Sequence, residues 1–221
     1  CMTTLVKVLV LKEKVKHLMN AAVADAMTRV GIIYTVNYGV SIPELKALAK
    51  PYLGDHELAL ELFREEIREC KLLATMIDDP ELITGEQLDE WANDFTNPEI
   101  VEQVCGNLFW KTGYALSRSI EWCLDDDELF QKAGLLIIAR KASDPNVGVN
   151  LLQPYIGVIE NMADTMTDTI LSSMSFALRE IAKRSPELCG MVLSAAQRMT
   201  QLDNELAAWL GNELIYELTE A

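Results

Sequence analysis

The stretch N-P-E-I-V-E-Q-V-C-G-N-L-F, residues 97–109, contains the pattern that decides the fold. Asn97 offers a side-chain oxygen that can cap a helix, and Pro98 follows at the first helical position, where a missing N–H leaves no hydrogen bond unmade. The apolar side chains that come next recur at the spacing of one helix face, at Ile100, Val101, Val104 and Leu108. The stretch therefore predicts a helix over 98–110 that buries one side and exposes the other.

Helix starts and apolar periodicity of this kind continue along almost the whole chain. The other strong start signals are capping residues followed by a partner or a proline, at Ser41, Thr84 and Ser185. The further helices expected cover 3–28 (continuous, or broken near Asn20), 42–52, 55–77 (with a break), 86–95, 113–123, 126–142, 146–160, 163–184, 187–199 and 203–219. The fold class is therefore all-α, either a globular bundle or stacked helix pairs of the solenoid kind.

Length and composition agree with one soluble helical domain. The chain has 221 residues, and no linker rich in Ser, Pro or Gly divides it, so we expect a single domain over 1–221. Its apolar runs are far shorter than the roughly 20 residues that cross a bilayer, so no membrane span is expected. The five cysteines are scattered, and no hydrophobic signal segment stands at the start. These features favour a reducing, cytoplasmic location.

Charge is unevenly distributed along the chain. The net charge is −15, and residues 55–130 hold 20 acidic and 5 basic side chains. Such a balance opposes non-specific attraction to nucleic acids and to anionic membranes. Residues 131–200 hold seven basic and six acidic side chains, so they lack the acidic excess of residues 55–130. A locally positive face is therefore compatible with an acidic protein.

Most catalytic and ligand-binding motifs are missing from the sequence. The two histidines, His17 and His56, have no partner at ligand spacing, and no cysteine cluster is present. No phosphate-binding glycine loop and no nucleophile elbow occurs either. We therefore expect neither a metal nor a cofactor.

Two charged residues depart from the apolar pattern around them. Glu102 points away from the stripe of its helix, which suits either a carboxylate at an open groove or an ordinary solvated glutamate. Lys132 has apolar neighbours one and two turns later, at Leu135, Leu136 and Ala139. Because an unpaired buried charge is costly, its ammonium must reach a cleft or meet a carboxylate.

The helix over 163–184 carries an aromatic residue outside its packed stripe. That stripe consists of Met166, Ile170, Met174, Ala177 and Ile181. Phe176 lies on another side of the helix, together with Arg179 and Lys183. An aromatic ring beside two cations suits contact with a sugar-phosphate chain, whereas the alternative is that a neighbouring helix covers Phe176.

Five stretches between about residues 30 and 185 carry a family resemblance. They are N-Y-G-V-S-I-P-E-L-K-A-L-A-K (37–50), D-H-E-L-A-L-E-L-F (55–63), R-E-C-K-L-L-A-T-M-I-D-D-P (68–80), E-Q-V-C-G-N-L-F (102–109) and F-A-L-R-E-I-A-K-R (176–184). Together they resemble the HEAT-repeat DNA alkylation repair enzymes, the AlkD-like alkylpurine DNA glycosylases. The resemblance implies an α-α superhelix, a solenoid of degenerate HEAT-like repeats, rather than a bundle.

The resemblance also implies an activity, namely hydrolysis of the N-glycosidic bond of cationic N3- or N7-alkylated purines. In the family an aspartate stabilises positive charge on the sugar, tryptophans pack against the deoxyribose, and an arginine holds the DNA backbone. The segment with a tryptophan and then the aspartate four residues later reads Pro98 and Glu102 here. Lys132 stands at the arginine, and Phe176 at the tryptophan before A-L-R.

We therefore expect a DNA alkylation repair protein with a divergent site. Its catalytic carboxylate is Glu102, and its contacts to alkylated duplex DNA are made by Lys132, Phe176, Arg179 and Lys183. The alternative is a non-catalytic HEAT-like scaffold that binds DNA or a protein partner through the same groove.

Overall fold

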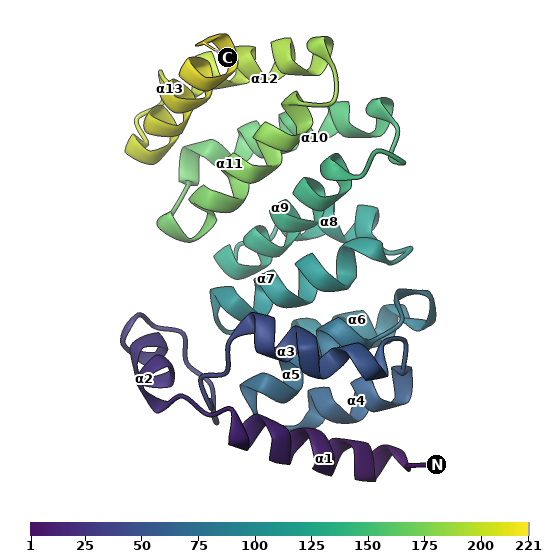
Figure 1. Cartoon of the computed structure of the whole chain (residues 1–221). Coiled ribbons are helices and arrows are strands. Elements are labelled where there is room, and N and C mark those ends of the chain that lie inside the picture. Colours follow the sequence, from purple (N-terminus) through teal and green to yellow (C-terminus); the bar gives the residue numbers. More distant parts are fainter. Residues whose placement is uncertain (221) are drawn as a thin grey trace. The chain divides into compact units, whose positions relative to one another are not determined.

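The structure, a computed structural model, describes residues 1–220 and confirms the all-α prediction. Its α-helices, drawn in Figure 1, are α1 (Thr4–His17), α2 (Ala21–Arg29), α3 (Ile42–Ala49), α4 (His56–Arg64), α5 (Arg68–Ile77), α6 (Gly85–Ala92), α7 (Pro98–Asn107), α8 (Ala115–Cys123), α9 (Glu128–Ser143), α10 (Val149–Met162), α11 (Asp168–Ala182), α12 (Pro186–Met199) and α13 (Glu205–Glu220). Short 3-10 turns are η1 (Lys50–Tyr52), η2 (Pro80–Leu82), η3 (Phe109–Lys111) and η4 (Ala163–Thr165). An isolated parallel β-bridge joins Val36 and Ile67.

The predicted helix starts are confirmed at the level of single residues. The Ser41 hydroxyl accepts a hydrogen bond from the N–H of Glu44, whose carboxylate accepts one from the N–H of Ser41, so the capping box is complete. Thr84, Asn97 and Ser185 cap α6, α7 and α12 through their side-chain oxygens. Of the two alternatives for residues 3–28, the broken helix is the one observed, because α1 ends at His17 and the Asn20 side chain caps α2.

The predicted helix over 163–184 is wrong at its start. Residues 163–165 form η4, and α11 begins only at Asp168. Ala163 and Met166 are 0% and 4% exposed although they lie outside α11. The apolar periodicity therefore continues through a buried turn, and periodicity alone cannot separate such a turn from a helix.

The chain forms two compact units, Cys1–Gly113 and a second unit that begins at Tyr114. In the first unit α4 packs on α5, and α5 also packs on α3 and α7. In the second unit neighbours in sequence pack together, as α8 with α9 and α12 with α13, and so do helices two apart, as α9 with α11, α10 with α12 and α11 with α13. This is the packing of stacked helix pairs. The single domain predicted over 1–221 stays a prediction.

The first unit is built on a leucine-rich core with an aromatic stack. The rings of Phe63 and Trp91 lie 3.9 Å apart between centroids and are nearly parallel, and Phe109 lies 6.4 Å from Trp91. The predicted buried face of α7 is confirmed, since its apolar stripe is at most 1% exposed. One face of α7 is therefore packed into the core of this unit.

The second unit packs its helices at close range. The predicted apolar stripe is buried: its four members on α11, Ile170, Met174, Ala177 and Ile181, are 0% exposed, and Met166, which precedes α11, is 4% exposed. Gly134 lies where α9 crosses α8, and a Cβ atom there would stand 2.6 Å from the carbonyl oxygen of Ser119. Glycine thus permits the close helix contact. Within residues 1–220 no helix combines the length and the apolar character that a membrane crossing needs.

Candidate functional site

Glu102 extends from the exposed side of α7. Its side chain is exposed, whereas the apolar side chains on the other side of the helix belong to the core of the first unit. A carboxylate on a packed helix has a well-defined backbone position, and electrostatic catalysis depends on groups that are positioned in advance. The packing of α7 therefore fixes the backbone position of Glu102.

Lys132 lies between α9 and α11 of the second unit. Its side chain is 3% exposed, and its Nζ donates to the Ser173 hydroxyl at 3.0 Å and, over a longer 3.5 Å, to the carbonyl oxygen of Thr169. The structure thus brings Lys132 together with α11, the helix that carries the other predicted binding residues. Its ammonium is therefore held against α11 instead of extending into solvent.

Phe176 lies one turn of α11 after Ser173. It is half-buried and packs against the apolar core of the second unit. The observed packing is closer to the covered aromatic residue that the sequence left as an alternative. A partly covered ring can still offer an edge for contact with a sugar.

Arg179 and Lys183 continue the same side of α11, and both are ion-paired. Arg179 donates from Nε and Nη2 to the two carboxylate oxygens of Glu217 on α13, at 2.6 and 2.7 Å. Lys183 donates to Glu180 at 2.8 Å, one turn earlier on α11. The positive face expected from the sequence is therefore neutralised at these two cations by the protein's own carboxylates.

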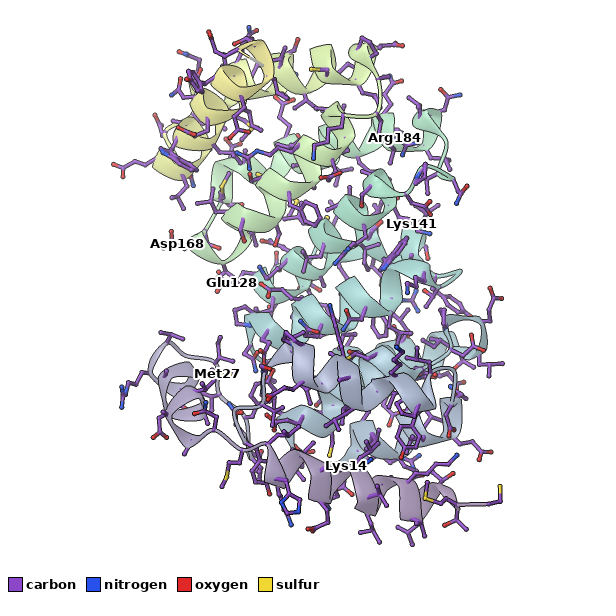
Figure 2. All side chains as sticks on the ribbon, in the orientation of Figure 1. Lys14, Met27, Glu128, Lys141, Asp168 and Arg184 are labelled. Carbon is purple, nitrogen blue, oxygen red and sulfur yellow. The ribbon has the colours of Figure 1, made fainter. Side chains whose placement is uncertain are left out.

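Two further arginines of the second unit are engaged in structural contacts. Arg184, labelled in Figure 2, donates to the carbonyl oxygens of Ala142 and Asp144 at 3.0 and 3.1 Å and also to that of Val147. Carbonyls at the end of a helix lack intrahelical partners, so Arg184 stabilises the end of α9. Arg198 on α12 forms a two-contact pair with Glu160 on α10, at 2.7 and 2.9 Å.

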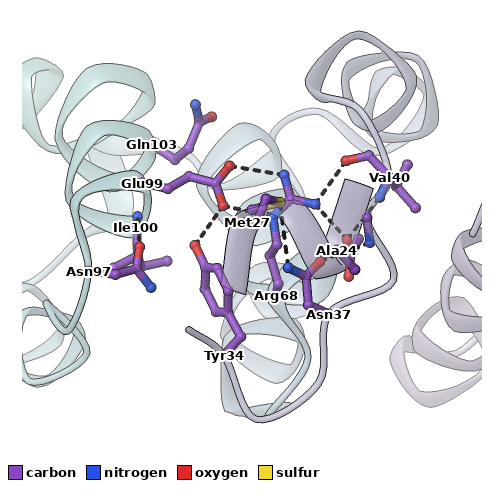
Figure 3. A network of polar contacts seen from close by, with 12 residues as sticks. Ala24, Met27, Tyr34, Asn37, Val40, Arg68, Asn97, Glu99, Ile100 and Gln103 are labelled. Atoms are coloured by element: carbon purple, nitrogen blue, oxygen red, sulfur yellow. Dashed lines mark hydrogen bonds and ion pairs between the residues drawn. The ribbon is translucent and has the colours of Figure 1, made fainter. Parts of the chain in front are cut away.

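A buried ionic network occupies the first unit and is drawn in Figure 3. Arg68, at the start of α5, is 3% exposed and donates from Nε and Nη2 to Glu99 of α7 at 2.7 and 3.0 Å. Its Nη1 donates to Glu69 at 2.6 Å and to the carbonyl oxygen of Val40 at 2.8 Å. Burial alone lowers the pKa of Arg68, but the hydrogen bonds and charges of Glu99 and Glu69 raise it above its usual value.

The same network fixes the segment that precedes α3. The Tyr34 hydroxyl donates to Glu99 at 2.8 Å, and Glu69 accepts from the N–H groups of Tyr38 and Val40 at 3.1 and 3.2 Å. Burial, followed by the charge of Glu99, raises the pKa of Tyr34 above its usual range, so the hydroxyl stays protonated. The network therefore joins three parts of the chain to the first turn of α7.

A cavity of about 300 Å³ lies beside this network. Its wall includes Tyr34, Lys71 and Asp94. The ammonium of Lys71 is paired with Asp94 at 3.0 Å, donates to the carbonyl oxygen of Phe63 at 2.8 Å and lies over the Phe63 ring. These contacts give the ammonium of a lysine that is only 7% exposed the partners that a buried polar group needs.

Sequence reasoning missed the network around Arg68. A signal was present, because Arg68 and Glu69 begin a helix whose next residues are almost all apolar, and charged side chains in such a segment are buried only when paired. The partners Tyr34 and Glu99 were not recognisable, because each lies about 30 residues away and only the tertiary fold brings them together. Within residues 1–220 no group of three His, Cys, Asp or Glu side chains is arranged to hold a metal ion.

Comparison with known proteins gives a consistent family assignment. A sequence model of a family described as DNA alkylation repair enzyme matches residues 11–204. No curated protein matches the chain.

Similarity to solved structures supports the fold. One structure, described as a new family of proteins related to the HEAT-like repeat DNA glycosylases with affinity for branched DNA structures, has a TM-score of 0.75 and 18% identity, over 93% of this chain and 92% of that one. An engineered protein has a TM-score of 0.39 and 17% identity, over 82% of this chain and 70% of its own. The first similarity confirms the predicted fold of HEAT-like helical repeats, and the second carries no weight.

Proposed function

The chain belongs to the DNA alkylation repair enzyme family, and we propose that it releases N3- or N7-alkylated purines from DNA by hydrolysis of the N-glycosidic bond. Glu102 is the catalytic carboxylate of this proposal. The binding of alkylated duplex DNA is assigned to Phe176, Arg179 and Lys183, and to Lys132, whose ammonium is buried against α11 and acts through its charge.

The protein does not need to protonate the leaving base, because the alkylated base already carries a positive charge. The bond between C1′ and the base nitrogen breaks, its electron pair neutralises the departing base, and positive charge develops on the deoxyribose. Water adds at C1′ and loses a proton. A carboxylate below the sugar stabilises the developing charge, and such preorganised electrostatic groups are usually the largest single contribution to a rate enhancement.

The observation that supports this role most strongly is the position of Glu102. It is an exposed carboxylate three residues after Glu99, whose side chain is held by Arg68 and Tyr34. The first turns of α7 are therefore anchored by the core on one side and by the ionic network at Glu99. A fixed helix gives Glu102 the defined position that the proposed mechanism needs.

The test is base release from DNA that carries 7-methylguanine or 3-methyladenine, with protein in excess over lesion. We expect release faster than the spontaneous rate. Glu102→Gln should lose this acceleration, whereas Glu90→Gln, which changes an exposed glutamate of α6 in the same unit, should keep it. Release by the wild-type protein at the rate of the protein-free control would contradict the proposal.

A second candidate function is binding of DNA structures without base release. It is favoured by the ion pairs of Arg179 and Lys183, by the burial of Lys132, and by Pro98 in place of an aromatic wall. The solved structure with the same fold is described as having affinity for branched DNA. Tighter binding to a four-way junction than to a duplex of the same sequence, together with no base release, would favour this function.

A further inference from the structure

The contact between Arg179 and Glu217 has the geometry that an arginine offers to a phosphate. Two parallel N–H groups, Nε and Nη2, each donate to one oxygen of the same carboxylate, at 2.6 and 2.7 Å. The guanidinium fork binds carboxylates and phosphates in the same two-contact manner. A DNA phosphate that approaches Arg179 would therefore compete with Glu217 for the same donors.

This pair is accessible to solvent. The Arg179 side chain is 32% exposed and the Glu217 side chain 40%. The hydrogen bond from Arg179 lowers the pKa of Glu217, so the carboxylate is ionised at neutral pH. Exposed ion pairs of this kind contribute little to stability, so a DNA phosphate can displace Glu217 without damage to the fold.

The position of the pair also matters. Arg179 lies on α11, one turn after Phe176 and one turn before Lys183. Lys132 of α9 contacts the same helix at Ser173. Arg198 and Glu160 form a pair of almost the same geometry, but this pair joins α12 to α10 and includes no residue of α11 or α13. The second unit therefore contains one pair beside the predicted binding residues and one matched pair elsewhere.

We infer that Glu217 is an intramolecular competitor of DNA phosphate at Arg179 and sets the strength with which the α11 face binds DNA. The inference rests on the proposed DNA-binding function and adds a residue to it. In the unbound protein Glu217 neutralises Arg179, as Glu180 neutralises Lys183, so the face carries no net charge from these two pairs. Binding then exchanges one anion for another at Arg179.

The inference predicts that two variants with the same change in charge bind DNA differently. Glu217→Gln removes the competitor, whereas Glu160→Gln removes the same charge from the matched pair on α10. We expect Glu217→Gln to bind a short fluorescein-labelled duplex about 1.4- to fivefold more tightly than the wild type, because the exposed ion pair no longer has to be broken before the phosphate binds. Glu160→Gln should bind as the wild type does.

Salt dependence gives a second, independent readout of the same exchange. In the wild type one carboxylate is released for each phosphate bound at Arg179, so this contact contributes almost nothing to counterion release. In Glu217→Gln the contact should make the log-log slope of affinity against salt more negative by about 0.9. The slope of Glu160→Gln should stay at the wild-type value.

The double variant Arg179→Met, Glu217→Gln should lose the gain of the single Glu217→Gln change, because the phosphate contact is then absent. Thermal unfolding followed by circular dichroism checks that the variants are folded. Equal affinity and slope for Glu217→Gln and Glu160→Gln, in a protein that binds DNA, would overturn the inference and leave the proposed function standing. Absence of DNA binding by the wild type and by Glu217→Gln would overturn both.

Discussion

The two units hold arginine–glutamate pairs of nearly the same geometry that differ in burial. In the first unit Arg68 contacts Glu99 at 2.7 and 3.0 Å and is 3% exposed. In the second unit Arg179 contacts Glu217 at 2.6 and 2.7 Å and is 32% exposed. Contact distances therefore do not separate a structural pair from an exchangeable one, whereas exposure does.

The physical reason is the cost of leaving a partner behind. When one member of a buried pair is removed, the other stays in a medium that solvates it poorly, and the loss is typically about 3–5 kcal/mol. An exposed partner regains water, so its loss costs about 0.2–1 kcal/mol. Arg68 therefore stabilises the fold, and Arg179 is available for another anion.

The largest effect is expected for Arg68→Met. This change leaves Glu69 and Glu99 without their shared cation, so the free energy of unfolding should fall by about 3–5 kcal/mol. Urea denaturation measures it, and Arg179→Met is the matched change in the exposed pair, with an expected loss below about 1 kcal/mol. Similar losses for the two variants would contradict the role assigned to burial.

A smaller effect is expected for Tyr34→Phe. The hydroxyl donates to the side chain of Glu99, which also pairs with Arg68, and a hydrogen bond to a charged group contributes about 1.5–3 kcal/mol. Because the pKa of Tyr34 is raised in the folded state, this contribution is complete below the unfolded pKa near 10 and is lost as the pH rises above it. Unfolding measured from pH 8 to 11 should bring wild type and variant closer together; a constant difference would show that Tyr34 is not the titrating group.

The smallest effect is expected at an exposed ion pair of the first unit. Because this pair lies in the same unit as Arg68 but is exposed, it shows whether burial or the unit determines the contribution of an ion pair. Lys7 donates to Asp55 at 2.7 Å, and both side chains are about one quarter exposed. Burial raises the pKa of Asp55, but the hydrogen bonds from Lys7 and from the Leu58 N–H outweigh it, so the pKa is lowered. The contribution is therefore present above the unfolded pKa near 4 and is lost as the pH falls through the folded one.

Lys7→Met should accordingly cost about 0.2–1 kcal/mol at pH 7 and almost nothing near pH 2. The free energy of unfolding in urea at the two pH values measures this difference. A loss as large as that of Arg68→Met would mean that the unit, and not burial, determines the strength of its ion pairs.

Much of the fold was predictable from sequence because its signals are local. A cap such as Asn97 and the apolar steps from Ile100 to Leu108 lie within a few turns of one helix, and the structure confirms both. The start of α11 was not predictable, since the buried Met166 continues the apolar pattern through a turn. Apolar periodicity indicates which side chains are buried, and side chains are buried in tight turns as well as in helices.

The candidate site was predictable only in part. Glu102 and Lys132 stand out in the sequence because each departs from the apolar pattern of its own helix, and their roles in a site stay predictions. The pairing of Arg179 with Glu217 was not, because the partners are 38 residues apart and only the packing of α11 on α13 brings them together. Sequence therefore identified charged residues that needed an explanation, and the structure supplied their partners.

The rate of 7-methylguanine release by wild type, Glu102→Gln and Glu102→Asp tests the central claim most directly. If Glu102 stabilises charge on the sugar, Gln should lower the rate on the order of 100-fold while affinity for undamaged DNA stays nearly unchanged. Asp restores the side chain that the family resemblance marks at this position, and it should retain or raise the rate. Equal release by all three proteins would contradict the claim that Glu102 acts in base release.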